Sequence, residues 1–327
     1  MRKIFFLVFL ISFRLYAVPS AEVLFDTNSF IVKVHAVDKQ GNHGVGSGVV
    51  VAKDYIVTNC HVIGNARGIH ITKFGVSYPP QALIADWEND LCILKFKYLG
   101  LKPVLLGNSQ GLDYEVDVFT KSYSGNSIRP SSSFGSIKGM FNFNGYKIIQ
   151  SSAFFSLGAG GGGIFDENGE LLGIITFKTP GRKAFYYSMP VEMIKDMLRE
   201  GMEVTITTQP EPPFWDAPAE NQPFFMQVVD PIKQESWGKL KEISKKWLIK
   251  EPKADESNFH LALAQYNLGE INQAKKIFKK VIKQNINHVL SYLYLYKIAK
   301  QENLESEMKK LRTLILDLDK TLIEEMN

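Results

Sequence analysis

Three short segments of the chain carry residue types that could do chemistry. They are TNCHV over residues 58–62, NDLCILK over residues 89–95 and GAGGGGIFD over residues 158–166. A histidine has an unperturbed pKa near 6.5, so its imidazole can take a proton from a hydroxyl near neutral pH. A carboxylate can orient that imidazole, and a glycine-rich turn can present backbone N–H groups to a developing oxyanion. These residue types are those that acyl transfer requires.

In this order and at these spacings, the segments resemble the signatures of the trypsin-like (chymotrypsin-fold) serine proteases, especially the bacterial branch. The resemblance covers roughly residues 23 to 205 and implies a double β-barrel. It implies that His61 is the general base and that Asp90, rather than the nearby Asp86, orients it. Either residue alone could be structural, but together they favour the catalytic pair.

The same resemblance places Gly160 where the family carries its nucleophilic serine. Glycine has no hydroxyl, so covalent acyl transfer cannot start there, and the residual catalysis of such a site is roughly 10³–10⁴-fold over water. Ser151, Ser152 and Ser156 lie upstream, and each would need a rebuilt loop to act. We therefore expect the chain to bind polypeptide with little or no hydrolysis. Three alternatives stay open: Gly160 is the natural residue, it was engineered, or it is an error in the sequence.

The resemblance also implies roles for residues around the cleft. The backbone N–H groups of Gly158 and Gly160 would form the oxyanion hole. Phe154 would lie at the base of the primary specificity pocket with Phe155 beside it, which favours a small or apolar substrate side chain over Lys or Arg. The alternative is that both phenylalanines are core residues. The residues expected on the strand that pairs with substrate are Thr176, Phe177 and Lys178.

The chain has two cysteines, Cys60 directly before His61 and Cys92 shortly after Asp90. Because the resemblance brings His61 and Asp90 together, it implies that the cysteines lie on neighbouring segments. A disulfide is then possible in an oxidising compartment, with two buried thiols as the alternative. Two cysteines and six scattered histidines offer no clustered ligand set, so we expect no metal and no cofactor.

The N-terminal residues have the pattern of an export signal. Arg2 and Lys3 precede the apolar run Ile4–Phe13, and small residues follow at 17–21. A helix over that run would rise only about 15 Å, half the thickness of a bilayer, so we do not expect it to span a membrane. We expect a signal peptide over residues 1–21 and a periplasmic or secreted mature chain, with membrane contact only for export.

Length and composition favour a soluble protein of two modest domains. The 327 residues are 45% hydrophobic and 22% charged, and the net charge of +4 argues against nucleic-acid binding. Apolar runs between turn residues predict strands in a peptidase domain over 22–208, with a surface loop at 122–136. The strands are expected at 30–37, 48–51, 55–58, 91–96, 116–119 and 171–177.

A linker is predicted over residues 209–230, because five prolines between Gln209 and Pro223 oppose both helix and central strand. Its aromatic residues are expected to pin it to one domain rather than to bind a ligand, and they are Phe214, Trp215, Phe224 and Phe225.

Residues 231–327 are predicted to form helices that resemble tetratricopeptide repeats, about two and a half of them. The positions that match a 34-residue frame beginning at Asp255 are Leu261, Ala262, Gly269, Ala274, Phe278 and Val281. Trp247 and Pro252 match the repeat before, and Tyr292 and Leu295 the repeat after. Asn303 replaces the turn glycine, because asparagine tolerates left-handed geometry.

Three functions fit these patterns. The first is a pseudoprotease that holds polypeptide in its cleft while the repeats dock a partner protein. The second is an active serine endopeptidase in which Gly160 replaces a native serine. The third is an adaptor that binds through its repeats and uses the barrel as a scaffold, although the repeats could also merely buttress the barrel.

Overall fold

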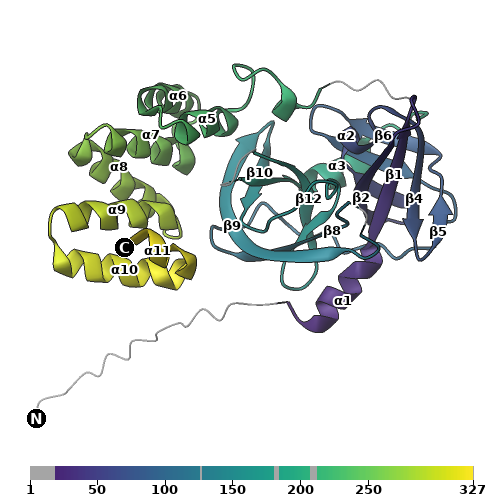
Figure 1. Cartoon of the computed structure of the whole chain (residues 1–327), viewed down its shortest axis with the longest axis horizontal. Helices are drawn as coiled ribbons and strands as arrows, with labels where there is room; N and C mark the ends of the chain where they lie inside the picture. Colours follow the sequence, from purple (N-terminus) through teal and green to yellow (C-terminus); the bar gives the residue numbers. More distant parts are fainter. Residues whose placement is uncertain (1–18, 126, 180–183, 207–211, 327) are drawn as a thin grey trace, which may run out of the picture.

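The computed structural model describes residues 19–125, 127–179, 184–206 and 212–326. The first part of the β region is an open antiparallel sheet of seven strands in the order β5-β4-β1-β2-β3-β7-β6 (Figure 1). Its interior is built from Val, Ile and Leu side chains such as Val34, Ile56 and Leu94, which are fully buried. The strands are β1 (Ile31–Asp38), β2 (His43–Ala52), β3 (Tyr55–Thr58), β4 (Ala66–Lys73), β5 (Val76–Tyr78), β6 (Ala82–Asp86) and β7 (Leu91–Lys95).

The second part is a closed six-stranded barrel in the order β10-β13-β12-β11-β8-β9. Its strands are β8 (Asp117–Ser122), β9 (Ser131–Phe143), β10 (Tyr146–Ser151), β11 (Gly163–Phe165), β12 (Leu171–Lys178) and β13 (Tyr186–Pro190). The expected double barrel is therefore correct for this half only. The first sheet stays open because β5 is short and the free edge of β6 pairs instead with Val204, through two backbone hydrogen bonds to Leu83.

Three short helices interrupt the region that was predicted to be β throughout. They are α1 (Ala21–Phe30), α2 (Cys60–Ile63) and α3 (Val191–Glu200). Helix α1 begins where Ser20 accepts a hydrogen bond from the backbone N–H of Val23, a side-chain cap that favours helix over strand. The expected signal peptide falls, for residues 1–18, outside the described residues.

The surface loop expected at 122–136 was also wrong in its second half. Strand β9 already begins at Ser131 and pairs with β8, with Ser131 opposite Ser122 and Ser133 opposite Thr120. Ladder hydrogen bonds join backbone groups, so a run of serines can extend a strand when a partner strand lies beside it. The described residues between the two strands are 123–125 and 127–130.

The linker lies against the barrel over the part that the structure describes. Phe214 opens a single turn, η1 (Phe214–Asp216), and packs its ring on Phe143 with centroids 4.4 Å apart. Phe225 stacks on Phe141 at 4.7 Å. The prolines of residues 209–223 were expected to oppose helix; the described part of that stretch contains the single turn η1, and the rest of the predicted linker contains α4 (Phe224–Gln227) and α5 (Val229–Lys233). Pro223 and Pro231 sit before or within the first turn of these helices, where proline is tolerated.

The C-terminal region is a row of antiparallel helices, each packed on the next. They are α6 (Trp237–Lys250), α7 (Asp255–Asn267), α8 (Ile271–Gln284), α9 (Val289–Gln301) and α10 (Glu305–Leu318), followed by η2 (Lys320–Leu322) and α11 (Ile323–Met326). Helices α7 and α9 begin 34 positions apart, as do α6 and α8, and α8 and α10. Among the described residues, no helix is long and apolar enough to cross a bilayer.

One backbone feature recurs with this period. Glu235, Gly269 and Asn303 all take a positive φ, of 53°, 80° and 56°, and each lies at the turn before a helix of the row. The left-handed geometry expected for Asn303 is confirmed. A turn repeated at one spacing gives each helix pair the same geometry, which is how a row of pairs stacks regularly.

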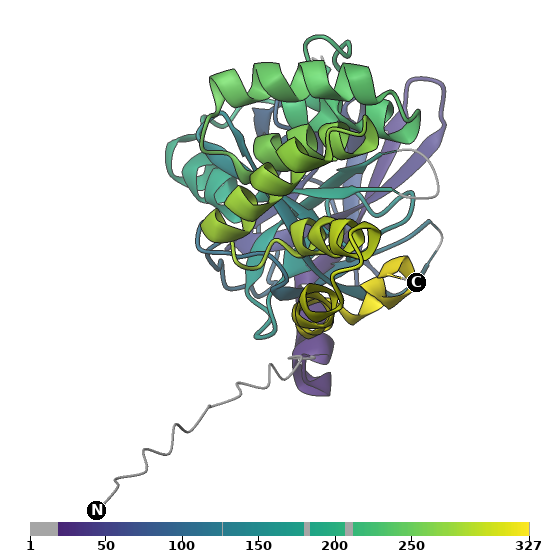
Figure 2. The ribbon, with the colours of Figure 1, turned by 90° about the vertical axis from the view of Figure 1, so that its left-hand side faces the viewer.

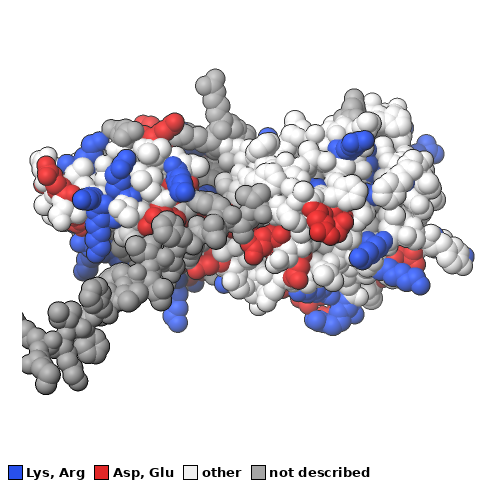
Figure 3. Space-filling model, turned by 90° about the horizontal axis from the view of Figure 1, so that it is seen from below, with Lys and Arg blue, Asp and Glu red and all other residues white. Residues whose placement is uncertain are grey.

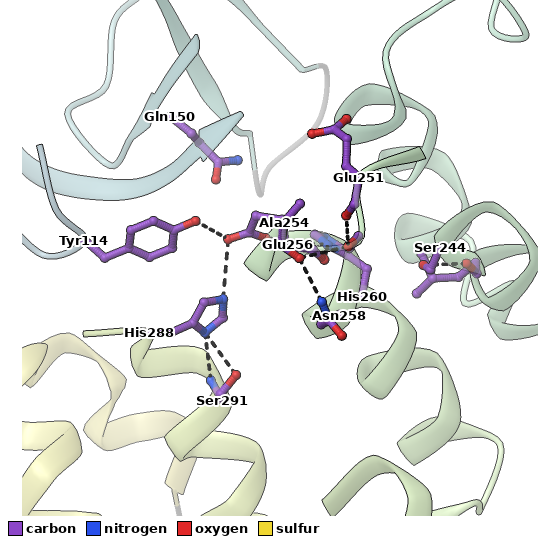
Figure 4. A network of polar contacts seen from close by, with 12 residues as sticks. Tyr114, Gln150, Ser244, Glu251, Ala254, Glu256, Asn258, His260, His288 and Ser291 are labelled. Atoms are coloured by element: carbon purple, nitrogen blue, oxygen red, sulfur yellow. Dashed lines mark hydrogen bonds and ion pairs between the residues drawn. The ribbon is translucent and has the colours of Figure 1, made fainter. Parts of the chain in front are cut away.

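The helices pack against the barrel on the side of β9 and β10, and Figure 2 shows them lying across the barrel. A cavity of about 440 Å³ lies between the two parts. At its wall the Tyr114 hydroxyl donates to Glu256 Oε1 at 2.8 Å, and His288 Nε2 lies 3.4 Å from the same oxygen, so both side chains point at one buried carboxylate (Figure 4). Nearby, Lys138 bridges Glu115 and Asp319.

Charged side chains of both signs are interspersed on the described face that Figure 3 shows. A mixed surface of this kind is typical of solvated helix faces rather than of a nucleic-acid footprint.

Candidate active site

His61 follows β3, and Asp90 directly precedes β7. These two strands pair, with Thr58 opposite Cys92, so His61 and Asp90 lie side by side. Asp90 Oδ2 lies 2.6 Å from His61 Nδ1, and Asp90 Oδ1 accepts the backbone N–H of His61 at 2.8 Å. Asp90 is fully buried, whereas the His61 side chain is 36% exposed. The carboxylate therefore engages Nδ1 and leaves Nε2 to meet a ligand, which is the orientation that a general base needs.

The alternative carboxylate, Asp86, does something else. Its two oxygens accept hydrogen bonds from the backbone and side-chain nitrogens of Asn89, at 3.0 and 2.7 Å. These bonds close the turn that leads into Asp90. Asp90 itself has φ 56°, a left-handed conformation that is uncommon outside glycine and asparagine and that often occurs at functional sites.

Gly160 lies directly in front of the imidazole. A Cβ built on this residue would be 3.0 Å from His61 Nε2 and 3.1 Å from Asn59 Oδ1. The backbone carbonyl of Gly160 accepts the N–H of Ser47 at 2.8 Å, which fixes the turn against the first sheet. Position 160 is thus where a side-chain hydroxyl would reach the base, and the residue present has none.

The turn around Gly160 contains two backbone N–H groups without a hydrogen-bond partner among the described residues. Gly158 and Gly161 take positive φ values of 83° and 85°, and glycine allows this geometry at little cost. The N–H of Gly161 is bonded to the carbonyl of Ile175, whereas those of Gly158 and Gly160 make no hydrogen bond with any residue that the structure describes. An oxyanion site needs backbone N–H groups that are free to donate to the developing charge, and these two groups meet that part of the requirement.

The family match follows the same residues. Residues 46–174 match the family model of the trypsin-like peptidase domain. Over these residues the chain is similar to trypsin-like peptidase domains.

Curated relatives and solved structures agree with this assignment. The chain is 28% identical over 177 residues to a probable periplasmic serine endoprotease DegP-like from Buchnera aphidicola subsp. Baizongia pistaciae, which covers 50% of this chain and 38% of the relative. It is 27% identical over 208 residues to serine endoprotease DegS of Haemophilus influenzae, covering 57% of this chain and 58% of the relative. The chain thus spans less than two thirds of either relative. The active form of the Rv3671c protease from M. tuberculosis superposes with a TM-score of 0.51 at 18% identity over 59% of this chain and 90% of that chain, which supports the protease fold.

Among the residues that the structure describes, none of the three upstream serines is placed in a hydrogen bond with His61. Ser151 is buried on β10, Ser152 bonds to Ser136 across the β9–β10 pair, and Ser156 is exposed. In the described part of the chain, His61 makes no hydrogen bond to a serine; its side-chain partner is Asp90.

The residues expected to contact the substrate differ in how far they are exposed to solvent. Phe155 is buried and meets Tyr186 edge to face at 5.2 Å, whereas Phe154 is 61% exposed. The role expected for Phe154 at the base of the primary specificity pocket stays a prediction. A Thr120 hydroxyl that donates to the carbonyl of Phe154 holds the backbone there and leaves the ring outside. On β12, Thr176 and Phe177 are buried and Lys178 is exposed.

Cys60 and Cys92 form a disulfide, with the two Cα atoms 5.0 Å apart. The bond joins the segment of His61 to that of Asp90, so it closes the loop between the two members of the pair.

Sequence reasoning missed two residues that touch the pair. Asn59 donates through Nδ2 to the carbonyl of Asp90 at 3.0 Å and to Thr176 Oγ1 at 3.1 Å, and it directly precedes Cys60 in the histidine motif. Its Oδ1 is buried without a hydrogen-bond partner among the described residues and faces Gly160. The second residue is Trp215 of the linker, which donates to Asp90 Oδ2. Nothing in the spacing of the motifs points to it.

Proposed function

We propose that this chain is a serine endopeptidase homologue that holds polypeptide in the cleft of its peptidase domain and does not hydrolyse it. The observation that carries the proposal is the position of Gly160, whose absent Cβ would lie 3.0 Å from His61 Nε2. A base placed opposite a residue without a hydroxyl has no proton to remove, so the acyl-enzyme cannot form. His61, Asp90 and the free N–H groups of Gly158 and Gly160 support ligand binding at the same place.

The test is to restore the hydroxyl with Gly160→Ser. The new Cβ would meet His61 and Asn59 at 3.0 to 3.2 Å, so these side chains must give by a few tenths of an ångström, and the partly exposed imidazole can do so. Loss of the nucleophile costs up to roughly 10⁶-fold in kcat where the rest of the machinery is intact. We expect casein cleavage in Gly160→Ser, and none in the natural chain or in Gly160→Ala, which adds the same Cβ without the oxygen.

Fluorophosphonate labelling of the protein purified from its source separates this proposal from the second candidate, an active endopeptidase. Labelling would show an activated serine and overturn the proposal. If Gly160 instead stands in for a native serine, resequencing the source DNA across codon 160 reads serine, and the natural enzyme behaves as Gly160→Ser does here.

We also propose that helices α6 to α10 are tetratricopeptide-like repeats. The 34-residue spacing of the helix starts and the left-handed turns at Glu235, Gly269 and Asn303 support this, as does the burial of Ala274 and Phe278 between paired helices. A partner protein would then dock on these helices. Residues of α7 and α9 line the cavity shared with the barrel, so part of this face is already used within the chain.

The adaptor function predicts that peptide binding does not involve the cleft. A bulky Gly160→Leu side chain would run into His61 and fill the space in front of it. We expect this variant to lose casein-peptide binding in fluorescence anisotropy, with Gly160→Ala as the matched control. Undiminished binding by Gly160→Leu would favour the adaptor.

We propose that the mature chain works in the bacterial envelope, periplasmic or secreted, after removal of residues 1–21. The Cys60–Cys92 disulfide supports an oxidising compartment, and the similar Buchnera protein is described as periplasmic. Fractionation of cells that produce the full chain tests this, since recovery in the cytoplasm with reduced cysteines would contradict it.

A further inference from the structure

Trp215 reaches the centre of the site from outside the matched peptidase residues. Its indole Nε1–H donates to Asp90 Oδ2 at 3.2 Å, the same oxygen that lies 2.6 Å from His61 Nδ1. The ring stands edge-on to the imidazole, with centroids 5.6 Å apart at 90°. Its other neighbour is Phe177 of β12, stacked at 5.7 Å and 18°. One side chain of the linker therefore contacts the base, the carboxylate and the strand expected to pair with substrate.

The linker holds this tryptophan in place from both sides. The backbone N–H of Phe214 donates to the carbonyl of Glu88 at 3.0 Å, next to the turn that carries Asp90. The Phe214 ring is buried between Phe143 and Phe177. On the other side, Gln222 Nε2 donates to the carbonyls of Trp215 and Ala217. The position of Trp215 is thus set by contacts to two strands and the Asp90 turn, not by a free chain.

The Asp90 carboxylate needs these donors because it is fully buried. A buried carboxylate is stable only when its oxygens are bonded, and each donor restricts the rotation of the group. The backbone N–H of His61 serves Oδ1, whereas Oδ2 serves both the imidazole and the indole. Thr176, the nearest hydroxyl on β12, donates instead to the carbonyl of Ile174 and accepts from Asn59, so it does not supply a bond to the carboxylate.

We propose that Trp215 is a positioning residue of the His61–Asp90 pair. Its indole N–H fixes the carboxylate rotamer, and its ring lies against both the imidazole and Phe177. The site is then assembled from two parts of the chain, the peptidase domain and the linker that leads into the helices. The proposal concerns the same site as the proposed function but does not depend on whether the chain hydrolyses peptide bonds.

The test is nuclear magnetic resonance of the imidazole Nδ1–H of His61 in the natural full-length chain. We expect a nuclear Overhauser effect between this proton and the indole N–H of Trp215, since both donate to one oxygen. We also expect the Nδ1–H to exchange with solvent about tenfold faster in Trp215→Phe, which keeps a ring but loses the donor. Unchanged exchange in that variant, or no Overhauser effect in the natural chain, overturns the proposal; the second readout needs no variant to fold.

Trp247→Phe is the matched control. This tryptophan also donates its indole N–H to a carboxylate, Glu251, at 3.1 Å, but it lies in α6 away from the pair. It should leave the His61 signal unchanged. In the Gly160→Ser background, Trp215→Phe should lower kcat about tenfold with little change in KM. If Gly160→Ser alone is inert, the proposed function has failed, while the imidazole signal still decides the role of Trp215.

Discussion

The Cys60–Cys92 disulfide should be the largest single covalent contribution to the stability of the open sheet. It closes a loop of sequence separation 32 between β3 and β7. In the chain-entropy treatment, closing a loop of this size lowers the entropy of the unfolded state and so raises its free energy by about 3.7 kcal/mol at 25 °C. The double variant Cys60→Ala/Cys92→Ala should therefore lose about 3–4 kcal/mol of unfolding free energy. That is a large fraction of the roughly 5–15 kcal/mol of a typical domain.

The assay is urea unfolding followed by far-ultraviolet circular dichroism and by tryptophan fluorescence. The two-part chain need not unfold in one step, so the loss is measured on the transition of the sheet region. Reductant should shift the unfolding curve of the natural chain to that of the double variant and leave the curve of the variant unchanged. A loss below about 1 kcal/mol, or a reductant effect on the variant, would refute the assignment of this stability to loop closure.

Two further predictions concern buried polar groups. Tyr114→Phe removes the hydroxyl that donates to the buried Glu256 carboxylate, so it should cost about 1.5–3 kcal/mol in urea unfolding; an unchanged midpoint would contradict the role of this bond in joining helices to barrel. Burial lowers the pKa of Lys73 and of Lys121 to about 8, and the charge of Lys73 adds to the effect on Lys121. Above pH 8 the folded chain has released protons that the unfolded chain keeps to about pH 10.4, so stability should rise between about pH 8 and 9.5, and Lys121→Met should flatten that rise. Equal slopes in the two proteins would show that Lys121 is not the titrating group.

The placement of the His61–Asp90 pair could be predicted because the relevant information is local. His61 follows the short apolar strand β3 within α2, Asp90 directly precedes the short apolar strand β7, and the two strands pair. The row of helices was predictable for a similar reason. Its repeat is visible in the sequence as residues such as Gly269 and Asn303, which adopt the left-handed turn conformation themselves. In both cases one segment and its spacing carry the signal.

The open first sheet and the start of β9 depend on contacts between distant segments. Leu83 pairs with Val204, which no periodicity of either segment indicates. The serines at the start of β9 resemble a loop in composition, and only the presence of β8 beside them makes a strand. Likewise the exposure of Phe154 follows from where its backbone is held, not from its residue type. The hydrophobic pattern of a segment indicates that it forms a strand, but it does not indicate which strand edges pair.

Trp215 is the clearest such case. The aromatic residues of the linker were expected to pin it to a domain, and Trp215 does so at the His61–Asp90 pair. The separation of 125 residues between Trp215 and Asp90 hides the contact from any motif. Pro213 and Pro223 directly precede η1 and α4, so this part of the linker forms short helical turns, and one of them places an indole beside a buried carboxylate. A proline-rich stretch with buried aromatics next to a catalytic-type domain should therefore be tested as part of the site before it is treated as a spacer.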